Sequence, residues 1–138
     1  MNNHLKAEFS SKSINESLAR IIVSGFIMPL DPTIEELADV KTAVSEAVTN
    51  SIIHGYENGD GTVILEMFLE ENLLTLKVSD NGIGIADIEQ AKKPLFTSKP
   101  ECERSGMGFT VMECFMDSLH IESSNGNGTT VTMTKKLG

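Results

Sequence analysis

An acidic residue and an amide lie four positions apart near the end of a long helical pattern. Glu46 and Asn50, followed by His54 at the same interval, would share one face of a helix. A carboxylate can orient or deprotonate a hydroxyl group, and an amide oxygen is a hard ligand suited to Mg²⁺. The spacing is therefore compatible with metal-assisted chemistry on a hydroxyl. A solvated polar helix face has the same residue types, so both interpretations stay open for this pair alone.

A second cluster of chemistry-bearing residues follows a pattern typical of a strand, in the stretch Asp80-Asn-Gly-Ile-Gly84. A buried Asp80 can accept a hydrogen bond from an exocyclic amine, which adenine carries where guanine carries a carbonyl. Gly82 and Gly84 permit positive φ and let a flat base or phosphates approach the backbone. An ordinary β-turn is the competing interpretation of the same residues.

A further pair of glycines, Gly106 and Gly108, immediately precedes a helical pattern. The backbone N–H groups and the dipole at a helix start favour an anion, and phosphate is the obvious occupant. A flexible loop end leading into an ordinary helix is the alternative. The stretch is not a P-loop, because no Gly-Lys-Ser/Thr occurs, and a dinucleotide fingerprint would need a parallel βαβ unit.

The elements that must position these residues follow from the hydrophobic periodicity of the first half. Alternation over 5–9 predicts an opening strand. The pattern Ser13-Ile-Asn-Glu16 resembles a capping box and predicts the start of a first helix. Thr33-Ile-Glu-Glu36 predicts a second capping box, which opens the helix that carries Glu46. Gly55 is the expected end of that helix.

The second half is dominated by strand patterns. Residues 62–69 and 73–79 predict one hairpin, and 119–123 with 129–135 predict another. The segments between the hairpins are predicted to be a short helix at 87–92, a loop at 93–105 and a helix at 109–116. Together these elements predict an α+β two-layer sandwich, with helices packed on one face of a mixed, largely antiparallel sheet.

Length and composition limit the class of protein. The 138 residues are expected to form a single domain, 1–138. No apolar run approaches the roughly 18 residues of a membrane span, and no signal-peptide pattern opens the chain, so a cytoplasmic protein is expected. The net charge of −9 argues against direct nucleic-acid binding. Cys102 and Cys114 have neither metal-site spacing nor a disulfide framework, which favours reduced thiols.

The motifs in chain order resemble those of the GHKL ATP-binding superfamily, whose members share the Bergerat fold. Each motif is unspecific by itself, but their order and separation match together. The four similarities are an N box at Glu46-x-x-x-Asn50, a G1 box at Asp80-x-Gly82-x-Gly84, a G2 box at Gly106-x-Gly108 and a final threonine at Thr130.

Within that superfamily, the stretches 42–56 and 94–109 closely resemble the anti-sigma F factors of spore-forming bacteria, and the resemblance covers essentially the whole chain. It implies a homodimer that binds and inhibits a sporulation sigma factor. It also implies a serine kinase that uses ATP and Mg²⁺ to phosphorylate an anti-anti-sigma factor and leaves ADP. Neither a nucleic acid nor a membrane is an expected direct partner.

The resemblance also implies a role for each matching residue. Glu46 would be the catalytic base or orienting carboxylate for the serine hydroxyl, and Arg104 would reach the γ-phosphate. Asn50 would bind Mg²⁺ and Asp80 would receive the adenine amine, supported by Thr130 through water. The other residues implied to contact the nucleotide are Gly82, Gly84, Thr97, Ser98, Lys99, Gly106, Met107 and Gly108.

Two other functions compete with this hypothesis. The chain would be a nucleotide-gated sigma-binding module without significant kinase activity if ATP only orders the loop at 93–105. It would be an ATPase of the gyrase or Hsp90 type if water is the acceptor, although no second, transducing domain accompanies the motifs. Phosphoryl transfer to a protein serine separates the leading hypothesis from both.

Overall fold

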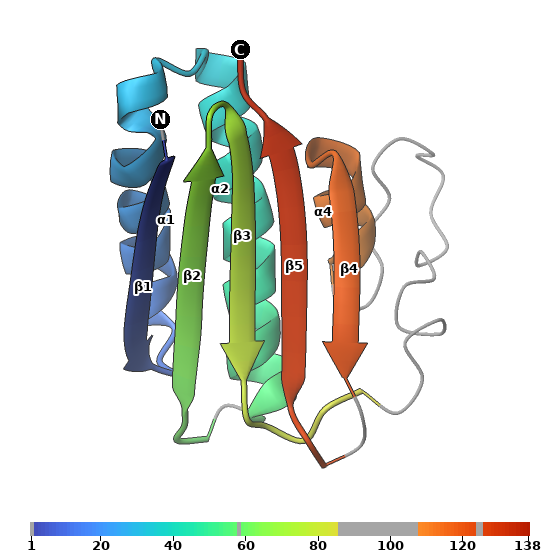
Figure 1. The fold of residues 1–138 in the computed structure, drawn as a ribbon. Coiled ribbons are helices and arrows are strands. Elements are labelled where there is room, and N and C mark those ends of the chain that lie inside the picture. The colour runs from blue at the N-terminus through green and yellow to red at the C-terminus, as the bar shows by residue number, and fades with distance from the viewer. Residues whose placement is uncertain (1, 58, 86–107, 124–125) are drawn as a thin grey trace, which may run out of the picture.

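The fold consists of one sheet with helices on one of its faces (Figure 1). The computed structural model describes residues 2–57, 59–85, 108–123 and 126–138. None of the described helices is long and apolar enough to cross a membrane. The elements are β1 (Asn2–Ser10), α1 (Ile14–Ile27), η1 (Met28–Leu30), α2 (Ile34–Asn50), η2 (Ser51–Gly55), β2 (Thr62–Glu70), β3 (Leu73–Asp80), α4 (Phe109–Phe115), β4 (Ser118–Ser123) and β5 (Thr129–Lys136).

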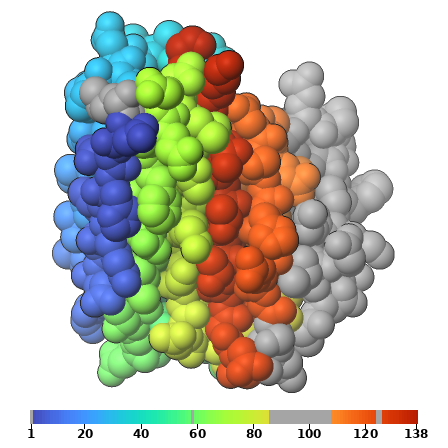
Figure 2. Space-filling view, viewed as in Figure 1, coloured from blue at the N-terminus to red at the C-terminus, as the bar shows by residue number. Residues whose placement is uncertain are grey.

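The described strands form a five-stranded sheet in the order β1-β2-β3-β5-β4, and each neighbouring pair is antiparallel. Figure 2 shows the sheet face that the helices leave open, with the strands side by side. The predicted α+β sandwich and both predicted hairpins are confirmed, but the described strands form only antiparallel pairs, so the expectation of a mixed sheet is wrong. The helix expected at 87–92 and the loop at 93–105 lie outside the described residues. Because β5 lies between β3 and β4, the end of β3 meets the start of β5.

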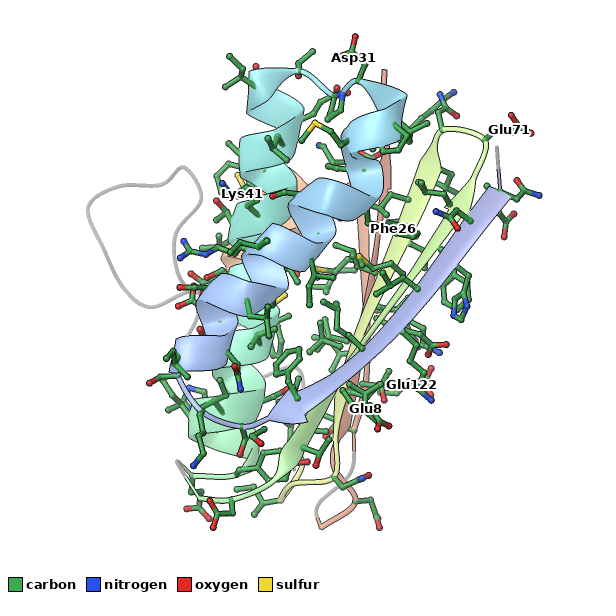
Figure 3. The ribbon with its side chains drawn as sticks, turned by 90° about the vertical axis from the view of Figure 1, so that its left-hand side faces the viewer. Glu8, Phe26, Asp31, Lys41, Glu71 and Glu122 are labelled. Carbon is green, nitrogen blue, oxygen red and sulfur yellow. The ribbon has the colours of Figure 1, made fainter. Side chains whose placement is uncertain are left out.

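The core lies between the sheet and the helices. Alternate residues of each strand point toward the helices, as the period of two requires. Figure 3 shows the two layers edge-on, with Phe26 between them and Glu8 on the opposite side of the sheet. Fully or almost fully buried core side chains from the central strands are Leu65, Met67, Leu74, Leu76, Val78, Val131 and Met133.

The two predicted capping boxes have different outcomes. At α2 the Thr33 hydroxyl accepts from the Glu36 N–H (3.0 Å), and the Glu36 carboxylate accepts from the Thr33 N–H (2.9 Å). At α1 the prediction is wrong, because Ser13 makes no side-chain capping bond. Its φ and ψ of −57° and −28° are helical, not extended as a capping residue requires. The Glu16 carboxylate instead accepts a hydrogen bond from Ser45 of α2.

Replacing Thr33 by alanine is expected to lower the free energy of unfolding by about 1 kcal/mol, because the Glu36 N–H loses its acceptor. The backbone N–H groups of Thr33 and Gly138 both donate to the Glu36 carboxylate and hold its pKa below the ordinary value. Urea denaturation at pH 7 measures the loss. Ser13→Ala is the matched control and should change stability by less than about 0.5 kcal/mol. Equal losses in the two variants would contradict this assignment of the caps.

A wide π-helical turn, η2, ends the long helix. The Tyr56 N–H donates to the Ser51 carbonyl at 3.0 Å, five residues back. Gly55 is the last residue of this turn, as predicted, and it is buried. A Cβ at Gly55 would lie 3.0 Å from the Asp80 carboxylate. The turn therefore brings the end of the helix against the end of β3. Single π-helical turns of this kind are frequent at functional sites.

Candidate functional site

A buried carboxylate stands at the end of β3. Asp80 is 7% exposed, and its Oδ1 accepts a hydrogen bond from the Gly82 N–H at 2.9 Å. Two glycines allow the chain to fold closely around it. A Cβ at Gly82 would lie 2.0 Å from the Gly55 carbonyl oxygen, and a Cβ at Gly128 would lie 2.2 Å from the Asp80 carbonyl oxygen. One carboxylate oxygen is thus held by its own loop, and the other can accept from a ligand.

The backbone N–H groups of the loop after Asp80 donate hydrogen bonds that hold the loop in place. The four N–H donors and their acceptors are Asn81 with the Tyr56 hydroxyl (2.8 Å), Gly82 with Asp80 Oδ1 (2.9 Å), Ile83 with the Gly55 carbonyl (2.9 Å) and Ile85 with Ser123 Oγ (2.7 Å). Of the two glycines of this loop, Gly84 has the positive φ that glycine permits, +76°, and Gly82 does not. Because these donors are already used, the loop is suited to receiving a base rather than a phosphate.

The start of α4 lies against the carboxylate of Glu46. Gly108 caps α4 with φ +69°, and a Cβ there would lie 2.3 Å from Glu46 Oε2. Asn50, one turn further along α2, is 7% exposed. The structure therefore brings together residues of the predicted N box and the last residue of the predicted G2 box. A γ-phosphate held at the start of α4 would lie beside a carboxylate and an amide.

A cleft runs between α2, η2, the end of β3, α4 and β5. Asn50, Asp80 and Gly84, three of the residues singled out from the sequence, line it. Glu46 lines a separate groove between α1 and α2, with Lys41 among its other walls. Side chains and backbone that sequence reasoning did not assign to this cleft are Ala47, Ser51, His54, Gly55, Ile85, Phe109, Thr129 and Val131.

The structure does not bring Thr130 to the cleft. Thr130 pairs with Ser79 across the sheet, and its hydroxyl donates to Ser79 Oγ at 3.3 Å. The residue opposite Asp80 is Thr129, which lines the cleft. Neighbouring strand residues point to opposite faces of a sheet, so only one of the two threonines can stand beside Asp80. The sequence offered two adjacent threonines and no signal for the register that selects the first.

Several residues named from the sequence lie outside the described residues. The predicted site residues in this group are Thr97, Ser98, Lys99, Arg104, Gly106 and Met107. Cys102 lies there as well. Cys114 of α4 is disulfide-bonded in the structure, so the expectation of a reduced thiol at this position is wrong.

Asn50 offers the oxygen donor that a magnesium–nucleotide complex would use. Its amide side chain is buried and lines the cleft one turn from Glu46. Mg²⁺ keeps several waters and takes further ligands from substrate phosphates, so one protein oxygen suits it when it arrives with a nucleotide. Within the described ranges, no group of three or more His, Cys, Asp or Glu side chains could hold a metal ion.

Known proteins resemble nearly the whole length of this chain. Residues 15–135 match the histidine kinase-like ATPase domain family. The anti-sigma F factor of Clostridium kluyveri is 62% identical over 133 residues, covering 96% of this chain and 94% of the relative. The chain belongs to the anti-sigma F factor family. Other members include the Clostridium perfringens SM101 protein, 59% identical over 99% of both chains, and the Bacillus velezensis protein, 57% identical over 99% of this chain and 94% of the relative.

The fold is also seen in a more distant protein. The crystal structure of the RsbU and RsbW domains of a Mycobacterium tuberculosis protein aligns with 98% of this chain at a TM-score of 0.70 and 18% identity, covering 32% of that longer chain. This likeness concerns the fold alone. Together with the domain family, it confirms for this anti-sigma F factor family member the GHKL-type, two-layer architecture that the motifs implied.

Proposed function

We propose that this chain binds and inhibits a sporulation sigma factor and phosphorylates a serine of an anti-anti-sigma factor. The observation that carries the proposal is 57–62% identity to anti-sigma F factors over nearly the whole chain. The cleft supports it independently, because its residues suit an adenine nucleotide and a magnesium ion. The proposal also includes a cytoplasmic location and a single domain over residues 1–138.

The proposed reaction moves one phosphoryl group. The serine oxygen of the partner attacks the γ-phosphorus of ATP, the bond to the bridging oxygen breaks, and ADP leaves. Glu46 orients the serine hydroxyl and takes its proton. Asn50 would hold Mg²⁺, which neutralises charge on the phosphates. Asp80 accepts from the adenine amine, and the start of α4 at Gly108 faces the phosphates.

The residues outside the described ranges complete the proposal. Arg104 is proposed to reach the γ-phosphate, and Gly106 and Met107 to donate backbone hydrogen bonds to the phosphates. Thr97, Ser98 and Lys99 are proposed to line the same part of the site. These assignments rest on the match between their motifs and those of the family, as given above.

A homodimer is part of the proposal. β1 is an edge strand of the described sheet, and it pairs with β2 along one side. Unpaired strand edges invite pairing with another chain. A second copy adding along β1 would extend the sheet and leave the cleft, at the far side of α2, accessible to nucleotide.

Incubation with Mg-ATP and an anti-anti-sigma protein is expected to produce one phosphoserine on that protein, detected by intact-mass and peptide mass spectrometry. Chelation of Mg²⁺ should stop the transfer, and replacing the acceptor serine by alanine should remove the product. Sigma association with nucleotide bound but no phosphoserine would favour the nucleotide-gated module. Steady release of inorganic phosphate without a protein acceptor would favour an ATPase.

A further inference from the structure

The Ser123 hydroxyl at the end of β4 bonds with three residues, which belong to two segments beside the cleft. It donates to the Gly128 carbonyl at 2.8 Å, accepts from the Ile85 N–H at 2.7 Å and bonds with the Thr129 hydroxyl at 2.8 Å. Ile85 ends the loop that follows Asp80, and it is only 9% exposed. A single hydroxyl therefore connects that loop with the turn and the strand opposite.

The hydrogen count at Ser123 decides the direction of the bond to Thr129. A serine hydroxyl has one proton to donate and two lone pairs to accept with. The proton goes to the Gly128 carbonyl, and one lone pair takes the Ile85 N–H. The remaining lone pair accepts from Thr129, so Thr129 is the donor in this pair. Its own hydroxyl then has only lone pairs left for the cleft.

The direction of the hydrogen bond from Thr129 matters because of where this residue lies. It is the cross-strand partner of Asp80 and lines the cleft beside it. The Asp80 carboxylate presents one hydrogen-bond acceptor to the cleft. The Thr129 hydroxyl directs its proton at Ser123, so its oxygen presents a second acceptor. Two acceptors side by side suit an amine, directly or through water, and oppose a carbonyl.

We infer that Ser123 is a positioning residue that sets the base specificity of the nucleotide site. It does so by fixing the Thr129 hydroxyl as an acceptor toward the cleft and by holding Ile85 in the loop after Asp80. Ser123 need not touch the nucleotide. This inference rests on the proposed nucleotide binding and adds the reason why an aminopurine would be preferred over an oxopurine.

The strand itself provides a matched control. Ser118, at the other end of β4, also faces a threonine of β5, and its hydroxyl bonds with that of Thr134. Neither residue of this second pair lines the cleft. Ser118→Ala therefore measures the general cost of losing a serine–threonine bond between these strands. Any further loss of nucleotide affinity in Ser123→Ala can then be attributed to the change in the cleft.

The test measures ATP and inosine triphosphate affinity by calorimetry, with Mg²⁺ present; inosine carries a carbonyl in place of the adenine amine. Ser123→Ala is expected to weaken ATP binding by about threefold to tenfold, the usual effect of one hydrogen bond. The freed Thr129 hydroxyl can turn and donate, so inosine triphosphate binding should weaken less and the preference for ATP should fall. Ser118→Ala should leave both affinities unchanged. Equal weakening of both nucleotides would show a merely structural role and overturn the inference.

A double-mutant cycle tests whether Ser123 acts through Thr129. Thr129→Val removes the hydroxyl and keeps the side-chain shape, so Ser123→Ala should change the preference for ATP little in that background. Additive changes would overturn the proposed route. Absence of ATP binding in the unmodified protein would refute the proposed function itself, whereas normal binding with an unchanged preference in Ser123→Ala would refute only this inference.

Discussion

Replacing Glu46 by glutamine should slow phosphoryl transfer to the acceptor serine by about 10²–10⁴-fold, the range for a lost general base. Nucleotide affinity should change little, because the carboxylate acts on the serine hydroxyl and lies outside the lining of the cleft. Glutamine has nearly the same shape, so the contact with Gly108 should persist. Single-turnover transfer and ATP calorimetry on the same preparation separate the two effects.

Glu35→Gln is a suitable control for Glu46→Gln. Glu35 is exposed in the first turn of the same helix, α2, and does not line the cleft, so the same chemical change there should alter neither rate nor affinity. If Glu46→Gln lowered ATP affinity as strongly as the transfer rate, the carboxylate would be a binding group and its catalytic assignment would be wrong. If it lowered neither, another group would have to accept the proton.

Asparagine in place of Asp80 should reduce ATP affinity by about 100-fold, because a charged hydrogen bond is lost and two donors then face each other. The asparagine oxygen can still accept from the Gly82 N–H, as Asp80 Oδ1 does. Its NH₂ group then points at the adenine amine. The same NH₂ group would suit a carbonyl, so Asp80→Asn should lose much less affinity for inosine triphosphate. Calorimetry with both nucleotides measures the reversal.

Asp39→Asn provides the comparison for Asp80→Asn. Asp39 is a partly buried aspartate whose carboxylate lies 3.7 Å from Lys135 Nζ, on the first turns of α2 and not in the cleft lining. Its replacement is expected to change stability but not nucleotide preference. A matching loss of ATP and inosine triphosphate affinity in Asp80→Asn would mean that the residue holds the fold of the loop without selecting the base.

Local patterns predicted most of the fold. Strand alternation and helical spacing located both hairpins and the long helix, and the capping box at Thr33 was found because all its members lie within four residues. The same pattern failed at Ser13, where Glu16 is engaged by Ser45, 29 positions away. A capping box is recognised from the residues of a single helical turn, so a contact from another helix can prevent it from forming.

The sequence predicted those site residues whose motif lies within one helix or one loop. It could not predict the residues whose position depends on the register between two strands. Glu46 and Asn50 share α2, and Asp80 with its glycines forms one loop, so sequence spacing sufficed. The choice between Thr129 and Thr130 depends on how β5 pairs with β3, and a slip of one residue reverses every side chain. The bonds of Ser123 arise from that same pairing, and no short motif contains them.

The extra-wide turn η2 makes the length of the segment between Asn50 and Tyr56 critical. Inserting one residue there, where the wide turn is already present, would rotate everything downstream by roughly 100° about the axis. The Gly55 carbonyl and the Tyr56 hydroxyl, which hold two N–H groups of the neighbouring loop, would then face elsewhere. Variation in this lineage should therefore tolerate substitutions in that segment far better than a change in its residue count.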